Sequence, residues 1–352
     1  MAINPSFWKG RRVLVTGHTG FKGSWLVLWL SDMGADVTGY ALAPPTAPSL
    51  YETAEAGVGV ESVEADIRDL DALARAFADA RPEVVFHLAA QSLVRPSYDD
   101  PLETFTVNVM GTANLLDAAR AAGGVSALVS VTSDKCYENR EWLWPYRENE
   151  PLGGHDPYSA SKACAEIVTA SFRRSFFGDP TAPSVATARA GNVIGGGDWA
   201  KDRLMTDLLT AFSTGKCSEI RNPSAIRPWQ HVLEPLSGYL MLAEKLAEKG
   251  RDYAEAWNFG PEASEAATVG AVADMAAALW GDGASWSHDQ GFHAHEAHLL
   301  KLDATKARIR LGWKPRMDLK EALSLTVKWH KALLSGQDMR KFTLGQIRNY
   351  MA

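Results

Sequence analysis

Tyr158 and Lys162 lie four residues apart in a stretch that predicts a helix. On a helix such residues share one face, so the lysine ammonium can lie beneath the phenol and favour its ionised form. A free tyrosine has a pKa of about 10, too high for a base at neutral pH, so this neighbouring charge is needed for proton abstraction. The pair is a candidate general base. The same spacing occurs on many solvated helix surfaces, so the assignment depends on its surroundings.

A glycine-rich loop lies between a predicted strand at residues 12–16 and an apolar segment at 25–30 that predicts a helix. Gly17, Gly20 and Gly23 would let the backbone turn tightly, approach a pyrophosphate and pack the helix against the strand. The helix N-terminus would attract the negative charge. The pattern predicts a dinucleotide site, although an ordinary strand-to-helix loop can carry the same glycines.

Strands and helices are predicted to alternate five times along the first part of the chain, which is typical of an α/β fold with a doubly wound parallel (Rossmann) sheet. The fourth predicted strand ends near Ala89 and Ala90, whose small side chains would let a cofactor lie against it. Ligands bind at the carboxyl ends of such strands. The glycine loop, residues 89–91 and residues 133–135 should therefore converge.

The adenosine end of a dinucleotide site usually has an acid just after the second strand, where it holds the ribose. Residues 41–43 are Ala-Leu-Ala instead, and no arginine is there to meet an extra phosphate, so the sequence favours NAD over NADP only modestly. Asp66 and Ile67 follow the third predicted strand and are candidates for the adenine contact. The alternative for Asp66 is a cap on the helix that starts near Asp69.

A change of composition near residue 190 predicts a second, smaller α/β lobe. We expect residues 1–190, with a return segment near 232–262, to form the cofactor domain, and residues 191–231 and 263–352 the substrate lobe. In that lobe Arg203, Arg227 and His231 are donors that could clamp a diphosphate or simply be solvated. Helices are expected at 234–249, 268–280 and 319–334. Residues 281–298 hold four histidines, but their spacing favours a polar loop over a metal site.

Bulk composition narrows the possible partners and compartment. The chain has 352 residues, with 42 acidic against 36 basic side chains and no basic block, which argues against nucleic acid or an anionic membrane as a partner. No apolar run approaches the roughly 20 residues of a membrane span. The 3 cysteines fit neither a zinc site nor a disulfide framework, which predicts a cytoplasmic protein.

Three motifs together resemble the extended short-chain dehydrogenase/reductase family acting on sugar nucleotides: the glycine loop, Leu88-Ala89-Ala90 and the Tyr158/Lys162 pair. Within it the chain is similar to the 4,6-dehydratases of CDP-glucose, in the loop at residues 195–199 and in the segment at 227–233. Relatives acting on dTDP-glucose carry Thr-Asp-Glu where this chain has Ser133-Asp134-Lys135. Simple 4-epimerases lack the acid and base pair.

The resemblance implies an internal oxidation and reduction through bound NAD. Tyr158, helped by Lys162, would take the proton of the sugar C4 hydroxyl, and Ser133 would hydrogen-bond that oxygen. Lys135, if neutral, would remove the C5 proton, and Asp134 would protonate the departing C6 hydroxyl. The alternatives are another nucleotide sugar as substrate, an epimerase, or a binding protein without chemistry.

The resemblance also implies binding residues and an assembly. The expected subunit contacts are helices at 105–122 and after Tyr158, which would form a homodimer or homotetramer. The residues expected to contact NAD are Thr16, Gly17, Gly20, Phe21, Lys22, Gly23, Asp66, Ile67, Leu88, Ala89, Ala90, Gln91, Tyr158 and Lys162, and those expected to contact CDP-glucose are Ser92, Arg95, Asn192, Arg203, Arg227 and His231.

Overall fold

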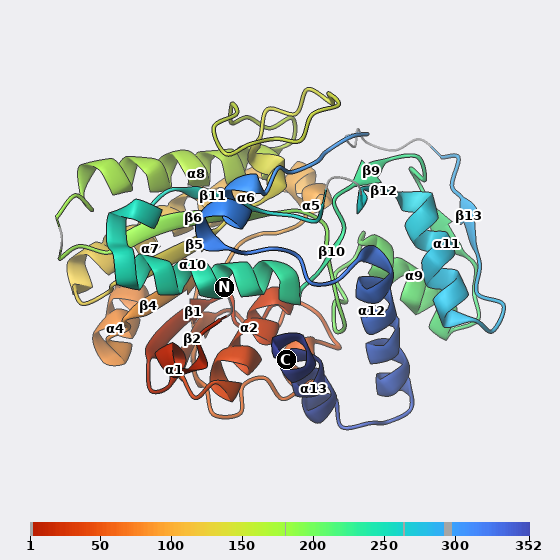
Figure 1. The fold of residues 1–352 in the computed structure, drawn as a ribbon, viewed down its shortest axis with the longest axis horizontal. Helices are drawn as coiled ribbons and strands as arrows, with labels where there is room; N and C mark the ends of the chain where they lie inside the picture. Colours follow the sequence, from red (N-terminus) through yellow and green to blue (C-terminus); the bar gives the residue numbers. More distant parts are fainter. Residues whose placement is uncertain (1–2, 180, 263–264, 292–297) are drawn as a thin grey trace.

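The computed structural model describes residues 3–179, 181–262, 265–291 and 298–352. Its centre is a seven-stranded sheet, ordered β11-β6-β5-β4-β1-β2-β3, in which every neighbouring pair is parallel (Figure 1). The order reverses beside β1, which is the doubly wound arrangement, so the predicted fold class is confirmed. The strands are β1 Arg12–Thr16, β2 Asp36–Ala41, β3 Glu61–Glu64, β4 Val84–His87, β5 Ala127–Val131, β6 Ser184–Ala190 and β11 Ala256–Phe259.

Helices cover both faces of the sheet (Figure 1). One face packs against α2 (Phe21–Asp32) and α10 (Leu233–Lys249), and the other against α4 (Leu70–Ala80), α7 (Gly111–Ala122) and α8 (Pro157–Ser175). Every residue of β4 and β5 is consequently buried, as expected for parallel strands covered on both sides. The remaining helices of the larger domain are α1 Pro5–Trp8, α3 Leu50–Thr53, α5 Val94–Asp99 and α6 Pro101–Phe105.

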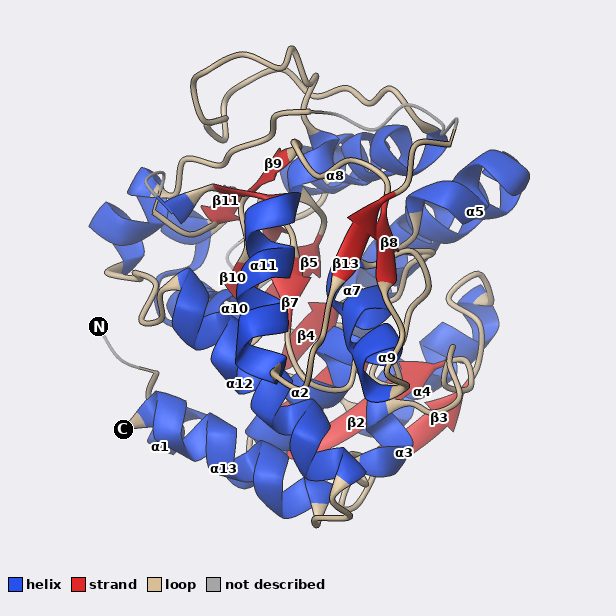
Figure 2. Ribbon diagram, turned by 90° about the vertical axis from the view of Figure 1, so that its right-hand side faces the viewer, coloured by secondary structure: helices blue, strands red, loops and turns tan. Residues whose placement is uncertain are grey.

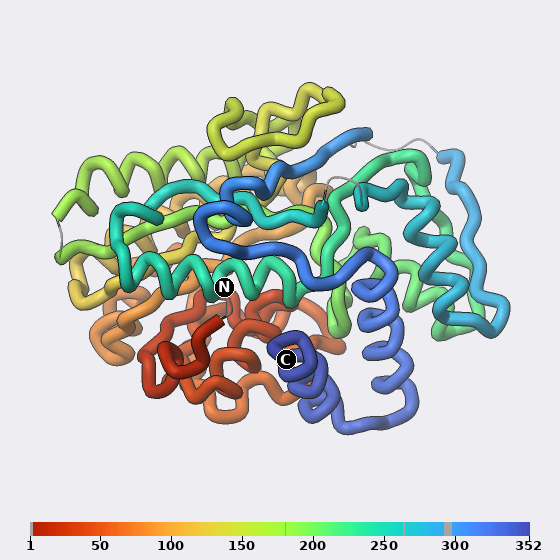
Figure 3. The backbone as a smooth tube through the Cα atoms, in the orientation of Figure 1, coloured from red at the N-terminus to blue at the C-terminus, as the bar shows by residue number. Residues whose placement is uncertain are grey.

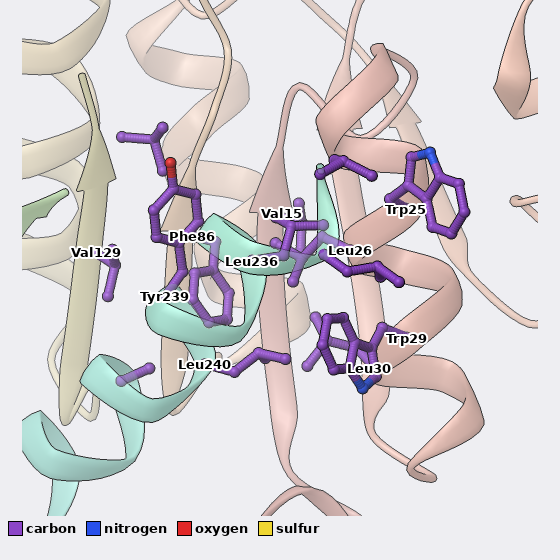
Figure 4. Close-up of a cluster of buried hydrophobic side chains, with 14 of the residues drawn as sticks. Val15, Trp25, Leu26, Trp29, Leu30, Phe86, Val129, Leu236, Tyr239 and Leu240 are labelled. Atoms are coloured by element: carbon purple, nitrogen blue, oxygen red, sulfur yellow. The ribbon is translucent and has the colours of Figure 1, made fainter. Parts of the chain in front are cut away.

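The hydrophobic core on the α2 and α10 side is rich in aromatic side chains. Figure 4 shows Trp25 and Trp29 of α2 and Tyr239 of α10 beside residues of the central strands. Trp29 also meets Tyr350 edge-on, with ring centroids 5.6 Å apart. Tyr350 belongs to α13 (Met339–Met351), which lies beside the N-terminal part of the chain in Figure 3. This helix, which the sequence did not predict, covers the outer side of α2.

The smaller lobe has its own hydrophobic core. Figure 2 shows its helices α9, α11 and α12 with the short strands β8 and β13. Three short two-stranded sheets join its helices. These elements are α9 Leu204–Ser213, α11 Val269–Trp280, α12 Leu319–Leu334 and the strand pairs β7 Val193–Ile194 with β10 Gln230–His231, β8 Ser218–Ile220 with β13 Trp286–His288, and β9 Ile226–Arg227 with β12 Ala267–Thr268. The segment predicted as a polar loop thus contains β13, which pairs with β8; His293 and His295 lie outside the described residues.

The domain boundaries remain a prediction, and packing of the C-terminal part suggests a refinement. Trp313 donates to Ser237 Oγ on α10 at 2.9 Å, and Tyr350 donates to Glu234 Oε2 at 2.8 Å. Both side chains are buried against helices of the larger domain. We therefore propose that the segment around residue 313 and α13 belong with the cofactor domain, while α11 and α12 belong with the substrate lobe.

Candidate active site

A cavity of about 660 Å³ lies between the carboxyl ends of the sheet and the smaller lobe. Two of the three segments whose convergence the sequence predicted line it, the glycine loop and residues 133–135, whereas residues 89–91 do not. The predicted site residues that line it are Gly17, Gly20, Phe21, Lys22, Gly23, Ser92, Arg95, Ser133, Asp134, Lys135, Tyr158, Lys162, Asn192, Arg203 and Arg227.

The start of α8 fixes the candidate base. Asp156 caps the helix by accepting from Ser159 N at 2.9 Å, and Pro157 occupies the first helical position. Tyr158 N donates to Ser97 Oγ at 3.1 Å, which ties this first turn to α5. Tyr158 and Lys162 then both face the cavity one turn apart, as the spacing predicts.

Burial dominates the protonation of the Tyr158 and Lys162 pair. It raises the pKa of Tyr158 to about 12, although a hydrogen bond with Ser133 acts in the opposite direction. Burial also lowers the pKa of Lys162 to about 8, against the pull of Glu166. The expected depression of the phenol pKa by the lysine is therefore not found in this cavity, where burial is the largest influence on Tyr158 and Ser133 the main opposing one.

Asp134 is buried at the tip of β5 in a single turn of 3-10 helix, Asp134–Cys136. Its Oδ1 accepts from Ser133 Oγ at 3.0 Å, whereas Oδ2 has no hydrogen-bond partner within the described structure. A Cβ on Gly191 would lie 2.0 Å from Oδ2, so only glycine fits there. Lys135 follows on the same turn and lines the cavity beside it. A carboxyl-bearing and an amine-bearing residue, consecutive in the chain, thus line the same cavity.

A buried ion pair lies behind the side of the cavity that residues 133–135, Tyr158 and Lys162 form. This side is called the catalytic wall. Glu166 lies one turn after Lys162 on α8 and accepts from Arg189 Nη2 at 2.8 Å. Its other donors are Thr132 Oγ1, next to Ser133, and Thr187 Oγ1. Burial alone would raise the pKa of Glu166, but Arg189 and these hydrogen bonds hold it below the usual value. The network ties α8, β5 and β6 together.

The glycine loop fits an anionic pyrophosphate. A Cβ on Gly17 would lie 2.7 Å from Ala89 N, and one on Gly23 only 2.1 Å from Gly17 O, so both glycines serve close packing. A Cβ on Gly20 would meet only Gly17 O, at 3.4 Å. No side chain caps α2, so the amides at the N-terminus of this helix remain available. The predicted division of roles among the three glycines matches this geometry.

Lys22 carries its amine into the same cavity. Burial, followed by repulsion from Arg203, lowers its pKa to about 7. The side chain is only partly shielded from water, because it faces a cavity inside the protein rather than packed atoms. Among the described residues Lys22 makes no ion pair. A bound anion would favour the protonated amine and raise this pKa, which is consistent with the predicted contact to a phosphate.

The predicted adenosine contacts lie outside this cavity. Asp66 is paired with Arg68 at 2.6 Å, while the helix cap that was its alternative role falls to Asp69. His18 packs its ring over Gly39 of β2 and bonds Ser62 at 2.7 Å. Burial lowers the pKa of His18 to about 4, so the ring is neutral. The contacts predicted for Asp66, Ile67, Leu88, Ala89 and Ala90 remain predictions.

Three predicted binding residues have structural contacts instead. Gln91 uses its amide to bond Leu93 and Thr104, and Thr16 bonds His87 at 2.8 Å. The ring of His231 is fully buried edge-on against Trp25, with centroids 5.8 Å apart, and lies outside the cavity lining. Because the ring reaches neither solvent nor the cavity, it is not placed to bind a diphosphate there, and the prediction for His231 is corrected.

Carboxylates at the substrate end escaped the sequence reasoning. Asp198 pairs with Arg203 at 2.9 Å, and Asp202 pairs with Arg95 at 3.0 Å. Arg221 joins Asp202 at 2.8 Å, and all five side chains line the cavity. The loop at 195–199 stands out in the sequence for its glycines. The aspartate that follows them, Asp198, was the signal that could have predicted a carboxylate in the cavity. Asp202 and Arg221 gave none, because single charged residues in loops are usually solvated.

Asn108 is a further residue that sequence reasoning missed. The helix predicted at 105–122 is interrupted by a π-helical turn, Thr106–Met110, which turns Asn108 inward. Its amide donates to Ser161 Oγ at 2.8 Å and to Gln91 O at 2.9 Å, which joins α8 to the loop after β4. A π turn often marks a functional site, and here it holds the base helix in register.

The described residues contain no cluster of three or more side chains that could hold a metal ion. None of the described helices is long and apolar enough to cross a bilayer.

Comparison with known proteins supports the same interpretation as the residues of the cavity. The family model described as GDP-mannose 4,6 dehydratase matches residues 14–326. The chain belongs to this family of nucleotide-sugar dehydratases. Its residues are 54% identical to the CDP-glucose 4,6-dehydratase of Salmonella typhimurium over 99% of both chains. The resemblance predicted from the motifs is therefore confirmed.

Other relatives show how far the family extends. A UDP-glucose 4-epimerase of Mycolicibacterium smegmatis is 32% identical over 91% of this chain and 98% of its own length. The solved dTDP-glucose 4,6-dehydratase DesIV of Streptomyces venezuelae, which contains NAD, superposes with a TM-score of 0.78 at 26% identity. The superposition covers 93% of this chain and 99% of that one.

Proposed function

We propose that the protein removes water from CDP-D-glucose to give CDP-4-keto-6-deoxy-D-glucose, with NAD as its cofactor. The observation that carries the proposal is the convergence of Ser133, Asp134, Lys135, Tyr158 and Lys162 on one cavity, beside a glycine loop that fits a pyrophosphate. The high identity to a CDP-glucose 4,6-dehydratase and the NAD in DesIV support the substrate and the cofactor.

Each step has a side chain of matching chemistry. Bound NAD would accept a hydride from the sugar C4 and return it to C6, so no net oxidation occurs. Tyr158 takes the C4 hydroxyl proton while Ser133 hydrogen-bonds that oxygen. The resulting ketone acidifies C5, whose proton Lys135 removes. Asp134, whose Oδ2 has no partner among the described residues, protonates the leaving C6 hydroxyl, and water departs.

Binding of the nucleotide diphosphate falls to the smaller lobe. We propose that Asn192, Arg203 and Arg227 hold the two phosphates, with Ser92 and Arg95 on the facing side of the cavity. Guanidinium groups suit this task because they donate two parallel hydrogen bonds to one phosphate. Holding the sugar between this clamp and the catalytic wall supplies the orientation that the reaction needs.

Substrate profiling tests the proposal. The purified protein, supplied with NAD, should convert CDP-glucose to a product lighter by one water, and should convert dTDP-, UDP- and GDP-hexoses far more slowly. Turnover of dTDP-glucose without CDP-glucose would refute the assignment of Lys135 as the base. Epimerisation without loss of water would favour the alternative represented by the UDP-glucose 4-epimerase. Binding of NAD with no turnover would indicate a protein without chemistry.

We also propose that the protein assembles through helices of the larger domain, as a homodimer or homotetramer. Large apolar side chains on and beside these helices are exposed: Leu102 of α6 is 77% exposed, Met110 54% and Ile167 of α8 56%. A second copy would bury them. Light scattering of Ile167→Glu against the unmodified protein tests this, since loss of the oligomer is expected.

The free cysteines, one of them exposed, support a reducing cytoplasmic setting.

A further inference from the structure

Asp202 joins two arginines that come from opposite sides of the cavity. Its Oδ1 accepts from Arg95 Nη1 at 3.0 Å and from Arg221 Nη1 at 2.8 Å. Arg95 lies on α5 of the larger domain, and Arg221 follows β8 in the smaller lobe. All three line the cavity. One carboxylate therefore bridges the two lobes across the place where the substrate diphosphate is proposed to bind.

The backbone of this loop is held in a disfavoured conformation. Asp202 has φ +62°, in the left-handed region that non-glycine residues avoid unless their surroundings compensate. The same loop directs a second carboxylate, Asp198, at Arg203, at 2.9 Å. Two arginines proposed to serve the diphosphate, Arg95 and Arg203, are thus each occupied by an aspartate from one loop.

A carboxylate and a phosphate compete for the same donors. Guanidinium N–H groups bind either anion with similar geometry, but a diphosphate carries more charge and more acceptor atoms. The pairs of Asp202 are partly exposed, with 33% of its side chain and 43% of that of Arg95 open to solvent. Such pairs contribute little stability and exchange readily. The ligand can therefore displace the aspartate without unfolding the loop.

We propose that Asp202 is an internal substitute for the substrate diphosphate, which holds Arg95 and Arg221 together across the cavity and releases them when the ligand arrives. The proposal rests on the proposed function in placing a diphosphate at this end of the cavity. The competing interpretation is that Asp202 positions the arginines for the ligand. The two interpretations predict opposite effects on affinity when the charge is removed.

The test is the variant Asp202→Asn in the full-length protein, with affinity for CDP and for inorganic pyrophosphate measured by titration calorimetry. Asparagine tolerates the left-handed region, so the backbone is conserved. If Asp202 competes with the ligand, the Kd of both should fall about fivefold, and Asp202→Glu, which keeps the charge, should remain within about twofold of the unmodified protein. An unchanged or higher Kd in Asp202→Asn would overturn the proposal.

Asp282→Asn is the matched control. Asp282 is an exposed aspartate with φ +52° in the loop after α11, and it lies outside the cavity lining. Its variant should bind both ligands as the unmodified protein does; an equal gain in both variants would mean that net charge, not Asp202, is the cause. Pyrophosphate separates this proposal from the proposed function. Tighter pyrophosphate binding by Asp202→Asn in a protein that does not dehydrate CDP-glucose would refute the function and keep the substitute role.

Discussion

Two buried carboxylates, Glu166 and Asp134, lie on either side of the residue pair Thr132 and Ser133, yet their surroundings are opposite. Glu166 accepts hydrogen bonds on both oxygens, two of them from a buried arginine. Asp134 accepts one hydrogen bond, and its second oxygen has no partner among the described residues. Both side chains are at most 3% exposed.

The difference separates support from chemistry. An unpaired buried oxygen costs free energy, so a protein tolerates it only where something else compensates. Behind the sheet tip every group of the Glu166 network is satisfied, as a structural network requires. In the cavity wall an unsatisfied carboxyl, a tyrosine with a raised pKa and two lysines with lowered pKa values gather within one space. Such clustering is typical of an active site.

Two tyrosine variants test most directly whether the catalytic wall and the Glu166 network have separate roles. Tyr158→Phe should lower kcat by about 10³-fold, because the hydroxyl that moves the C4 proton is lost, while the fold is retained. Tyr137→Phe removes a hydroxyl that bonds Arg189 and Asn258 in the buried network. That variant should keep most of its activity and lose about 1–2 kcal/mol of stability. Steady-state kinetics and urea unfolding of both variants measure the two effects. Equal losses of activity would erase the distinction between wall and support.

Glu166→Gln should destabilise the protein by about 3–5 kcal/mol, because Arg189 is left as a buried charge without its counter-ion. The control is Glu150→Gln, which breaks the exposed pair with Arg147 and should cost less than about 1 kcal/mol. Denaturant unfolding at fixed pH gives both values. A cost for Glu166→Gln as small as that of the control would show that the network does not support the site.

Lys135→Ala separates the steps within the wall. Oxidation at C4 should continue, since Tyr158 and Ser133 are intact, but elimination should stall because the C5 proton has no base. Exchange of the C5 hydrogen with deuterium from the solvent, followed by mass spectrometry, should fall by at least about 10²-fold. Unchanged exchange would remove Lys135 from the role of base.

The fold was predictable because its signals are local and repeated. Buried strands such as β5 and the loop at Gly17 show in short windows of sequence, and parallel order follows from their alternation with helices. The convergence of the glycine loop with residues 133–135 followed from the same rule, whereas residues 89–91, which were predicted to join them, lie outside the cavity lining. The helix α13 was missed because its sequence is mostly polar. The helix packs against the outer face of α2, which is far away in the sequence, so no local pattern indicates it.

The failures at the site share one physical cause: the partner of a side chain cannot be read from its neighbours in sequence. His231 was predicted as a donor from its type, but β10 places it against Trp25. Asp202 and Arg221 gave no signal because their pairing depends on how the lobes meet. The direction of the Tyr158 pKa was wrong because spacing reports the nearby charge and omits the burial that opposes it.

A third buried carboxylate, Glu244 of α10, is intermediate between the two and gives the smallest expected effect. Its Oε1 accepts from Trp8 Nε1 at 2.8 Å and Asn4 N at 3.0 Å, and burial raises its pKa to about 7. Glu248 adds to the rise, while these donors and Lys245 oppose it. The folded state therefore binds a proton that the unfolded state has released between about pH 4.5 and 7. Stability from this group is complete below about pH 4.5, is lost progressively between about pH 4.5 and 7, and changes no further above that.

Glu244→Gln, which cannot ionise, should remove that loss. Its free energy of unfolding should match the unmodified protein at pH 5 and exceed it by on the order of 1 kcal/mol at pH 8. The control Glu150→Gln, in the exposed pair with Arg147 and not among the groups that shift the Glu244 pKa, should show no such divergence. Urea unfolding at the two pH values decides the matter. If the difference in unfolding free energy between Glu244→Gln and the unmodified protein is the same at both pH values, the two donors suffice to keep a buried carboxylate ionised. A cation such as Arg189 would then not be what distinguishes a supporting carboxylate from a reactive one.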